Sequence, residues 1–106
     1  MAKIKLQPDP TFKAKADIAV PGGVPVGVTF TFKYRTRQEM ERFLKSANEN
    51  EFDDDVKLIM AMVTGWELAD DFTEENVRTL VDSYISAPVS IFETYCRALT
   101  GVRSKN

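Results

Sequence analysis

The side chains best suited to chemistry in this sequence are carboxylates, and they gather in one part of the chain. Residues 49–75 hold ten acidic residues and a single lysine. They include two dense groups, Asp53–Asp55 and then Asp70, Asp71, Glu74 and Glu75. A calcium loop needs ligands at alternating positions around a central glycine, and neither group has that register. We therefore interpret these acids as solvated charges near helix N-termini, where carboxylates complement the helix dipole, and we predict no metal site.

Histidine is absent from all 106 residues, which narrows the available chemistry. Because histidine is the commonest general base and metal ligand, neither a Ser-His-Asp nor a Cys-His nucleophile system can be built. The single cysteine, Cys96, cannot form an internal disulfide or complete a zinc site. We expect it to be a small buried hydrophobe. Carboxylate, lysine or tyrosine chemistry stays open, but we predict that the protein is not an enzyme and uses no cofactor.

Length, apolar content and charge indicate a globular protein. A chain of 106 residues fits a single domain, placed at residues 1–106. No apolar segment approaches the roughly 18 residues of a membrane span, and the N-terminus has no signal-peptide core, so we predict a cytoplasmic protein without a membrane partner. The net charge is −2, but residues 1–48 carry nine basic and four acidic side chains, ahead of the acidic stretch. Such an uneven distribution of charge can orient a binding partner or another copy of the same chain.

Two segments near the N-terminus alternate between apolar and polar residues with the period of a β-strand. One runs from Phe12 to Val20 and the other from Val26 to Tyr34. The Pro-Gly-Gly run between them favours a tight reversal. We predict a β-hairpin within residues 12–35, whose apolar face helices must cover because an isolated hairpin is only marginally stable.

Residues 36–100 show helical spacing and helix-end signals. Thr36 and Glu39 have the spacing of a capping box. Asp53–Asp55 are suited to begin a second helix and Thr73 a later one, and Gly101 is expected to end the last. The predicted fold class is therefore α+β, an N-terminal hairpin packed against three or four short helices, with residues 101–106 as a polar tail.

The segment FTFKYRTR, residues 30–37, interleaves three aromatic residues with Lys33, Arg35 and Arg37. On an open sheet, aromatic side chains flanked by bases bind single-stranded nucleic acid. The three aromatic residues share a face with Val26 and Val28, however, and helices are expected to bury that face. A core role is therefore favoured, and the acidic balance of the chain also argues against a nucleic-acid partner.

The segment VKLIMAMVTGW, residues 56–66, is the second candidate for binding. A helix that is apolar nearly all round is either central or shows one face to another protein. Gly65 is expected to end this helix, and methionines suit adaptable contacts. Two interpretations stay open: these side chains fill the core, or they form a surface for a partner or for self-association. The candidate partner-binding residues are Leu58, Met60, Met62 and Val63.

From Gly65 onward the sequence resembles a known family. Its features are a Gly-Trp pair followed by acidic and aromatic residues, an FTEEN helix start, a YISA break, an IFETY helix segment and an LTGVRSKN end. These motifs resemble those of the small tail assembly chaperones of long-tailed bacteriophages and prophages. The hairpin and first helix match the family pattern more loosely, and the break at residues 85–88 departs from its usual small-residue turn.

The resemblance implies a non-enzymatic chaperone that binds the phage tape-measure protein, keeps it soluble and promotes assembly of the tail tube from the tail-tube protein. It also implies a place in the cytoplasm of the bacterial host and absence from the finished virion. In this interpretation the aromatic residues Trp66, Phe72, Phe92 and Tyr95 are structural anchors. One alternative is a tail-terminator or head–tail joining subunit, which would stay in the particle. The other is a single-stranded nucleic-acid-binding module.

Overall fold

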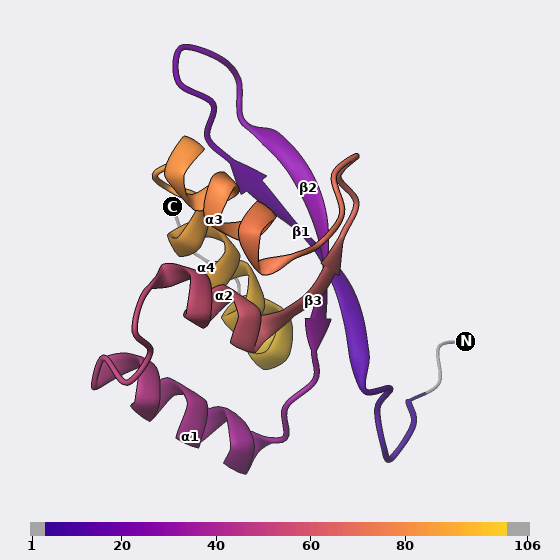
Figure 1. Ribbon diagram of the computed structural model, residues 1–106. Helices are drawn as coiled ribbons and strands as arrows, with labels where there is room; N and C mark the ends of the chain where they lie inside the picture. The colour runs from indigo at the N-terminus through magenta and orange to yellow at the C-terminus, as the bar shows by residue number, and fades with distance from the viewer. Residues whose placement is uncertain (1–3, 102–106) are drawn as a thin grey trace.

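The computed structural model describes residues 4–101 and has an α+β fold, as predicted (Figure 1). A three-stranded antiparallel sheet has the strand order β1-β2-β3. Four helices complete the fold. In chain order the elements are β1 (Thr11–Ile18), β2 (Val26–Lys33), α1 (Arg37–Asn48), α2 (Asp55–Met62), β3 (Val63–Trp66), α3 (Glu74–Ser83) and α4 (Ala87–Thr100).

The predicted hairpin is confirmed, with Phe12 opposite Phe32 and Ile18 opposite Val26. Its turn uses Gly22, whose φ of 73° is in the left-handed region where glycine is favoured. One face carries the buried residues of the strands and the other carries lysine and threonine side chains. Because of this alternation, only one face of the sheet has to be buried by helices, and the other can face water.

A third strand lies inside the region expected to be helical. Helix α2 ends at Met62, and β3 pairs with β2 through Phe30 opposite Trp66, with an irregularity between Thr31 and Phe32. The prediction that Gly65 ends the second helix is therefore wrong, since Gly65 lies within β3. The β-branched Val63 and Thr64 favour an extended backbone, and pairing with the hairpin stabilises it.

The helix starts agree with the capping signals. Thr36 Oγ1 accepts a hydrogen bond from the Glu39 amide at 3.2 Å, and Glu39 Oε1 accepts one from the Thr36 amide at 2.9 Å, which confirms the capping box. Asp54 caps α2 by accepting from the Lys57 amide. Thr73 caps α3 in the same way. Each bond satisfies an amide that has no partner within its own helix.

The last helix ends as predicted. Pro88 lies in the first turn of α4, where its missing N–H is harmless, and Gly101 ends the helix with a φ of 74°. The predicted polar tail, residues 101–106, lies outside the described residues apart from Gly101. Within residues 4–101, no helix combines the length and apolar character needed to cross a membrane.

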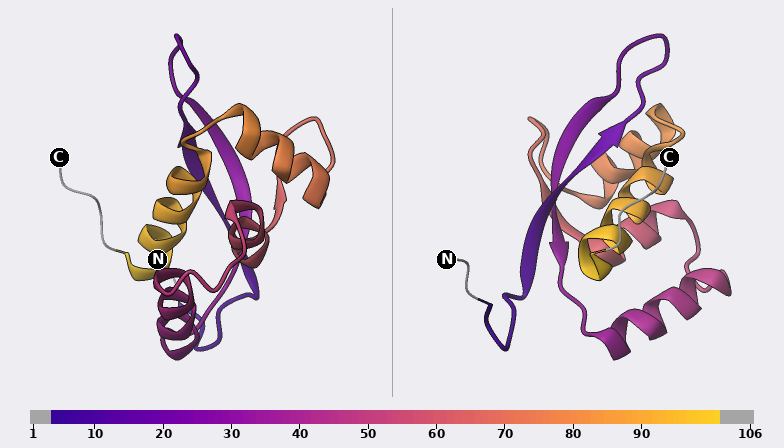
Figure 2. Two further views of the ribbon diagram at one scale, coloured as in Figure 1. Left: turned by 60° about the vertical axis from the view of Figure 1, so that its left-hand side comes forward. Right: turned by 180° about the vertical axis from the view of Figure 1, so that it is seen from behind.

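The helices pack on one face of the sheet, as the two views in Figure 2 show. Helix α4 lies along β1, and α2 packs against α4, α3 and the strands. Helix α1 lies furthest from the sheet and adds two buried side chains, Met40 and Phe43. The other buried apolar residues are Ala16, Ile18, Phe30, Phe32, Val56, Ile59, Met62, Val63, Val77, Ala87, Ile91 and Tyr95.

Candidate partner-binding site

The surface patch expected on the second helix is only partly at the surface. Met62 and Val63 are fully buried, which agrees with the core interpretation for these two candidate residues and not with a partner-facing one. Met62 lies on the inner side of α2 with Ile59 and Val56. Val63 is the first residue of β3, and its side chain is buried in the core. The structure thus places these two residues in the core.

Leu58 and Met60 are half-buried, but they do not form one patch. Residues two apart on an α-helix are separated by about 200° around its axis, so the two side chains lie on opposite flanks of α2. Leu58 faces a shallow hollow shared with Phe52 and Asp53–Asp55. A continuous apolar surface on α2 is therefore not available.

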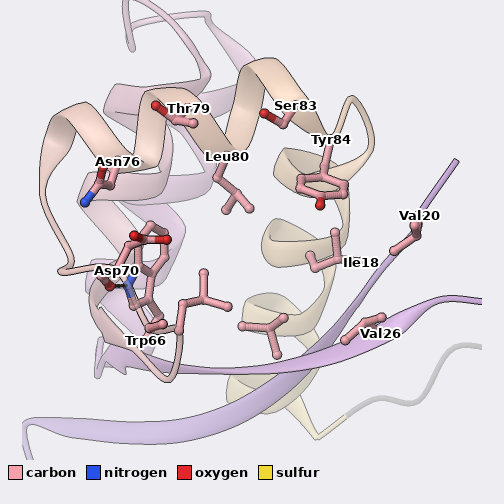
Figure 3. A pocket seen from close by; sticks show the side chains of 13 residues that line it. Ile18, Val20, Val26, Trp66, Asp70, Asn76, Thr79, Leu80, Ser83 and Tyr84 are labelled. Atoms are coloured by element: carbon pink, nitrogen blue, oxygen red, sulfur yellow. Dashed lines mark hydrogen bonds between the residues drawn. The ribbon is translucent and has the colours of Figure 1, made fainter.

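A cleft of about 450 Å³ opens elsewhere, between the outer half of the hairpin, the loop after β3 and helix α3 (Figure 3). Its α3 wall runs from Asn76 to Tyr84, which is about 12 Å at the helical rise of 1.5 Å per residue. Most of its lining is apolar, and the α3 wall also carries hydroxyl and amide groups. The lining residues are Ile18, Val20, Val26, Val28, Trp66, Leu68, Ala69, Asp70, Asn76, Thr79, Leu80, Ser83 and Tyr84.

Trp66 holds one end of this cleft. Its indole Nε1 donates a hydrogen bond to the carbonyl oxygen of Asp70 at 2.8 Å. Its ring meets Phe72 edge-on at 5.1 Å between centroids and Phe30 at 6.4 Å. Asn76 Nδ2 also donates to the carbonyl of Asp71. These contacts tie the loop of residues 67–73 to β2 and α3, so the cleft wall is held in place before any partner arrives.

The loop beside the cleft is acidic. Asp70 and Asp71 form no ion pair among the residues that the structure describes, and Glu67 is 3.4 Å from Lys13 in an exposed pair. The next acid, Glu74, differs because it is near Lys57 and Arg78 on the outer side of α3. Negative charge is therefore least balanced at the end of the cleft where Asp70 lies (Figure 3).

The basic and aromatic segment, residues 30–37, contributes to the core, as favoured from the sequence. Arg35 Nη1 donates to the carbonyl of Ala61 at 2.9 Å and to Tyr95 Oη at 2.8 Å. The Arg35 guanidinium also lies over the Phe43 ring, 4.3 Å from its centroid. Phe30 and Phe32 of the same segment are fully buried. The face that would have stacked on bases is thus covered by helices.

The four predicted anchors lie in two places. Tyr95 is fully buried and its hydroxyl donates to the Lys33 carbonyl at 2.8 Å. Phe92 is 6.3 Å from Phe43 between ring centroids, on the side of the fold where α1 packs. Trp66 and Phe72 contact each other beside the cleft.

Reactive groups give little indication of catalysis. Cys96 is half-buried, and burial, with a smaller contribution from Glu93, raises the pKa of its thiol above the ordinary value of 9.0. A raised thiol pKa disfavours the nucleophilic thiolate. Among residues 4–101, no group of three or more acidic or cysteine side chains is arranged to hold a metal ion.

Comparison with known proteins now gives the chain a family. A family model described as phage tail assembly chaperone matches residues 1–106. The chain belongs to this family. No curated protein and no solved structure matches it. The family match confirms the resemblance first noted in the C-terminal motifs and extends it over the hairpin and first helix, and it makes interaction with phage tail proteins the general role of this chaperone.

The cleft of this tail assembly chaperone was not predicted from its sequence. Ile18, Val20, Val26 and Val28 were assigned to the apolar face of the hairpin, which is correct, but helices cover only part of that face. Val26 remains 52% exposed. The opening follows from the lengths of the strands, which the sequence did not reveal because β3 was not predicted. Two eight-residue strands extend past the four-residue β3, so one end of the hairpin has no third strand beside it.

Proposed function

We propose that this chaperone binds the phage tape-measure protein, keeps it soluble and promotes polymerisation of the tail-tube protein around it. Family membership supports tail assembly as the general role. The observation that carries the finer proposal is the apolar cleft, whose volume of about 450 Å³ is in the range of sites that accept side chains of a bound ligand. Exposed apolar residues such as Val26 and Leu68 line it.

The cleft suits a client that presents repeated apolar stripes. Apolar side chains of an amphipathic segment would fill the space between the hairpin and Leu80, and affinity would come mainly from burial of apolar area. The acidic loop at Asp70 and Asp71 would favour client segments that carry Lys or Arg beside the stripe. Loose specificity of this kind allows several copies of the chaperone to cover one long client.

We place the client contact at this cleft and not on α2. Leu58 and Met60, the two candidate residues left at the surface, lie on opposite flanks of the helix and have no shared hollow. They can contribute only single contacts at the edge of an interface. The cleft brings apolar residues from three segments of the chain together.

Co-expression with the tape-measure protein, followed by a pull-down and a solubility assay, tests the proposal. We expect a soluble complex with several chaperone copies per client. The double variant Val26→Lys and Leu68→Lys should reduce client recovery, because it places two charges at an apolar mouth. Its matched control is Ile85→Lys with Val89→Lys, since these exposed apolar residues do not line the cleft.

The outcomes separate the function from the site. A client that stays insoluble and unbound with the wild-type protein contradicts the chaperone role. Equal recovery with both double variants, at unchanged circular dichroism, places the client elsewhere on the surface.

We further propose that the protein acts in the host cytoplasm and leaves before the virion is complete. The structural alternative, a tail-terminator or head–tail joining subunit, would remain in the particle. Mass spectrometry of purified virions distinguishes the two, because a chaperone should be missing and a joining subunit should be present at a fixed copy number.

A further inference from the structure

Strand β1 forms one edge of the sheet, because the strand order is β1-β2-β3. The strand contacts β2 on one side and α4 on its inner face. In the right-hand view of Figure 2, the N-terminal half of β1 lies at the margin of the molecule. An edge strand carries backbone N–H and C=O groups that can pair with a further strand. The edge of β1 is therefore a candidate site for such a strand.

Two hydrogen bonds show which backbone groups of β1 point away from the hairpin. The Glu67 amide donates to the Thr29 carbonyl at 2.9 Å, so that carbonyl faces β3. In an antiparallel pair the direction of these groups alternates along the strand. Lys15, the partner of Thr29, therefore directs its own N–H and C=O to the open edge. Ser90 of α4 donates to the Asp17 carbonyl from outside the hairpin, which gives the same direction two residues further on.

The open part of this edge consists of Thr11, Lys13 and Lys15. Their backbone groups point outward because these residues alternate along β1 with those that bond to β2. Among residues 4–101, no other backbone or side-chain group forms a hydrogen bond with these outward N–H and C=O groups. All three side chains are exposed. Each residue thus offers one free donor and one free acceptor to a partner strand.

The side chains at the open edge determine which charge a partner strand needs. Lys13 is 3.4 Å from Glu67 in an exposed pair, which contributes little stability. Lys15 forms no ion pair with any residue that the structure describes. Residues directly opposite each other in an antiparallel pair share a face of the sheet. Two acidic residues, two positions apart on a partner strand, would therefore meet both lysines.

The inner face of the same edge is apolar. Phe12 and Ala14 alternate with the lysines and are half-buried, and the Phe12 ring stacks on Tyr95 of α4 at 6.1 Å between centroids. An apolar residue between the two acids of a partner strand would point to this face. It would cover the part of Phe12 and Ala14 that the helices leave exposed.

We propose that the β1 edge binds an extended segment of a partner protein in which acidic and apolar residues alternate. The segment adds a strand antiparallel to β1 through the backbone groups of Thr11, Lys13 and Lys15. None of these three residues lines the cleft. The ligand also differs in charge from the basic client segment that the acidic loop of the cleft favours. This second site goes beyond the proposed function and does not depend on it.

A second copy of the chain is poorly suited to this edge. The antiparallel registers that pair most of the open part of one β1 with that of another place lysine opposite lysine. Like charges directly opposite each other destabilise a strand pair. A register that used Asp17 to meet a lysine is obstructed, because the Asp17 carbonyl already accepts from Ser90. The charges therefore select an acidic partner strand.

Titration of the full-length protein with a synthetic peptide tests the site. The probe is a short, capped, fluorescent peptide with glutamate and valine in strict alternation, and fluorescence anisotropy measures its Kd. We expect saturable binding that weakens at least about tenfold in the double variant Lys13→Glu and Lys15→Glu. The matched control is Arg37→Glu with Lys45→Glu, which makes the same change in charge at exposed positions of α1 and should bind like the wild type.

Modified peptides separate strand pairing from attraction between charges alone. N-methylation of the glutamates removes the N–H groups that would pair with β1 and should abolish binding to the wild type. N-methylation of the valines, whose N–H groups would point away, should leave binding intact. A peptide that alternates lysine with valine should bind the Lys13→Glu and Lys15→Glu variant more tightly than it binds the wild type.

Amide hydrogen exchange followed by NMR locates the bound strand. The peptide should slow exchange at the amides of Thr11, Lys13 and Lys15. It should have little effect at Phe12 and Ala14, whose amides already pair with β2. This alternation is the signature of an added strand, whereas binding to side chains alone would not produce it.

Absence of peptide binding at the highest attainable concentration overturns the inference, as does equal binding of the two methylated peptides. These peptides are tested on the wild type, so the result stands even if a variant fails to fold. Slowed exchange at Lys13 and Lys15 that increases with the concentration of the protein alone would show that a second copy occupies the edge, which also contradicts the inference. The cleft variant with Val26→Lys and Leu68→Lys should bind the peptide normally, so failure of this site is distinguishable from failure of client binding.

Discussion

Replacing Tyr95 with Phe should destabilise this chaperone through a single lost hydroxyl group. Tyr95 Oη donates to the Lys33 carbonyl at 2.8 Å and accepts from Arg35 Nη1 at 2.8 Å. The Phe ring can keep the stacking with Phe32, 5.3 Å between centroids, and the edge contact with Phe43 at 5.7 Å. The substitution therefore isolates two hydrogen bonds from the packing around them.

The expected loss of stability follows from the two groups that lose the Tyr95 hydroxyl as a partner, the Arg35 guanidinium and the Lys33 carbonyl. A hydrogen bond to a charged group contributes about 1.5–3 kcal/mol, and a carbonyl left without a donor in a buried place costs about 1–3 kcal/mol. Arg35 keeps its bond to the Ala61 carbonyl and its contact with Phe43, so part of the loss is offset. We expect a decrease of about 2 kcal/mol in the free energy of unfolding, or about 8–16 °C in Tm.

Urea denaturation followed by circular dichroism measures this change, and a constant m-value shows that the denatured state is not altered. A double-mutant cycle with Arg35→Met isolates the contact between the two side chains, with an expected coupling of about 1–2 kcal/mol. A loss below about 0.5 kcal/mol for Tyr95→Phe, or strictly additive effects in the cycle, would refute the idea that this hydroxyl links the sheet to α4 through Arg35.

Three further predictions concern other parts of the fold. Met62→Ala should cost about 2–5 kcal/mol because it leaves a cavity in the core, whereas Met60→Ala should cost less than half as much; urea midpoints compare the two. Thr36→Ala should cost about 1 kcal/mol through loss of the α1 cap, and equal stability would show that this cap is dispensable. Burial raises the pKa of Tyr95 above 10.0 and that of Cys96 above 9.0, so the folded state holds these protons more tightly than the unfolded state does. These two groups do not change the free energy of unfolding below about pH 9, and they lower it as pH rises from about 9 through 10. A pH series of urea midpoints for the wild type and Cys96→Ser measures this. The loss of stability that begins near pH 9, which comes from Cys96, should be absent in the variant.

Local signals in the sequence predicted the local features of the fold. The Thr36 and Glu39 pair specifies its own hydrogen bonds within four residues, so the capping box can be identified without knowledge of the rest of the chain. The alternation from Phe12 to Val20 likewise reports which side of a strand is apolar. Such patterns depend on neighbours in sequence, and the structure confirms them.

Features that depend on distant partners were missed. Strand β3 has only four residues, too few to show a period, and it exists because β2 offers an edge to pair with. Core and partner surface stayed open for Met62 and Val63, because an all-apolar helix does not reveal which flank its neighbours cover. The cleft could not be predicted for a related reason: the apolar face of the hairpin is continuous in sequence, and the point at which helices stop covering it is set by the position of α3.

The packing of α4 on β1 has a consequence for synthesis of the protein. These are the last and first elements within residues 4–101. Ser90 Oγ donates to the carbonyl of Asp17 at 2.6 Å across 73 residues. On the ribosome the hairpin emerges early and exposes the apolar side of β1 until α4 has left the exit tunnel. Contacts of such long sequence separation slow folding and extend the period in which apolar surface is open to aggregation. The nascent chaperone therefore cannot cover the apolar side of β1 until α4 has been synthesised.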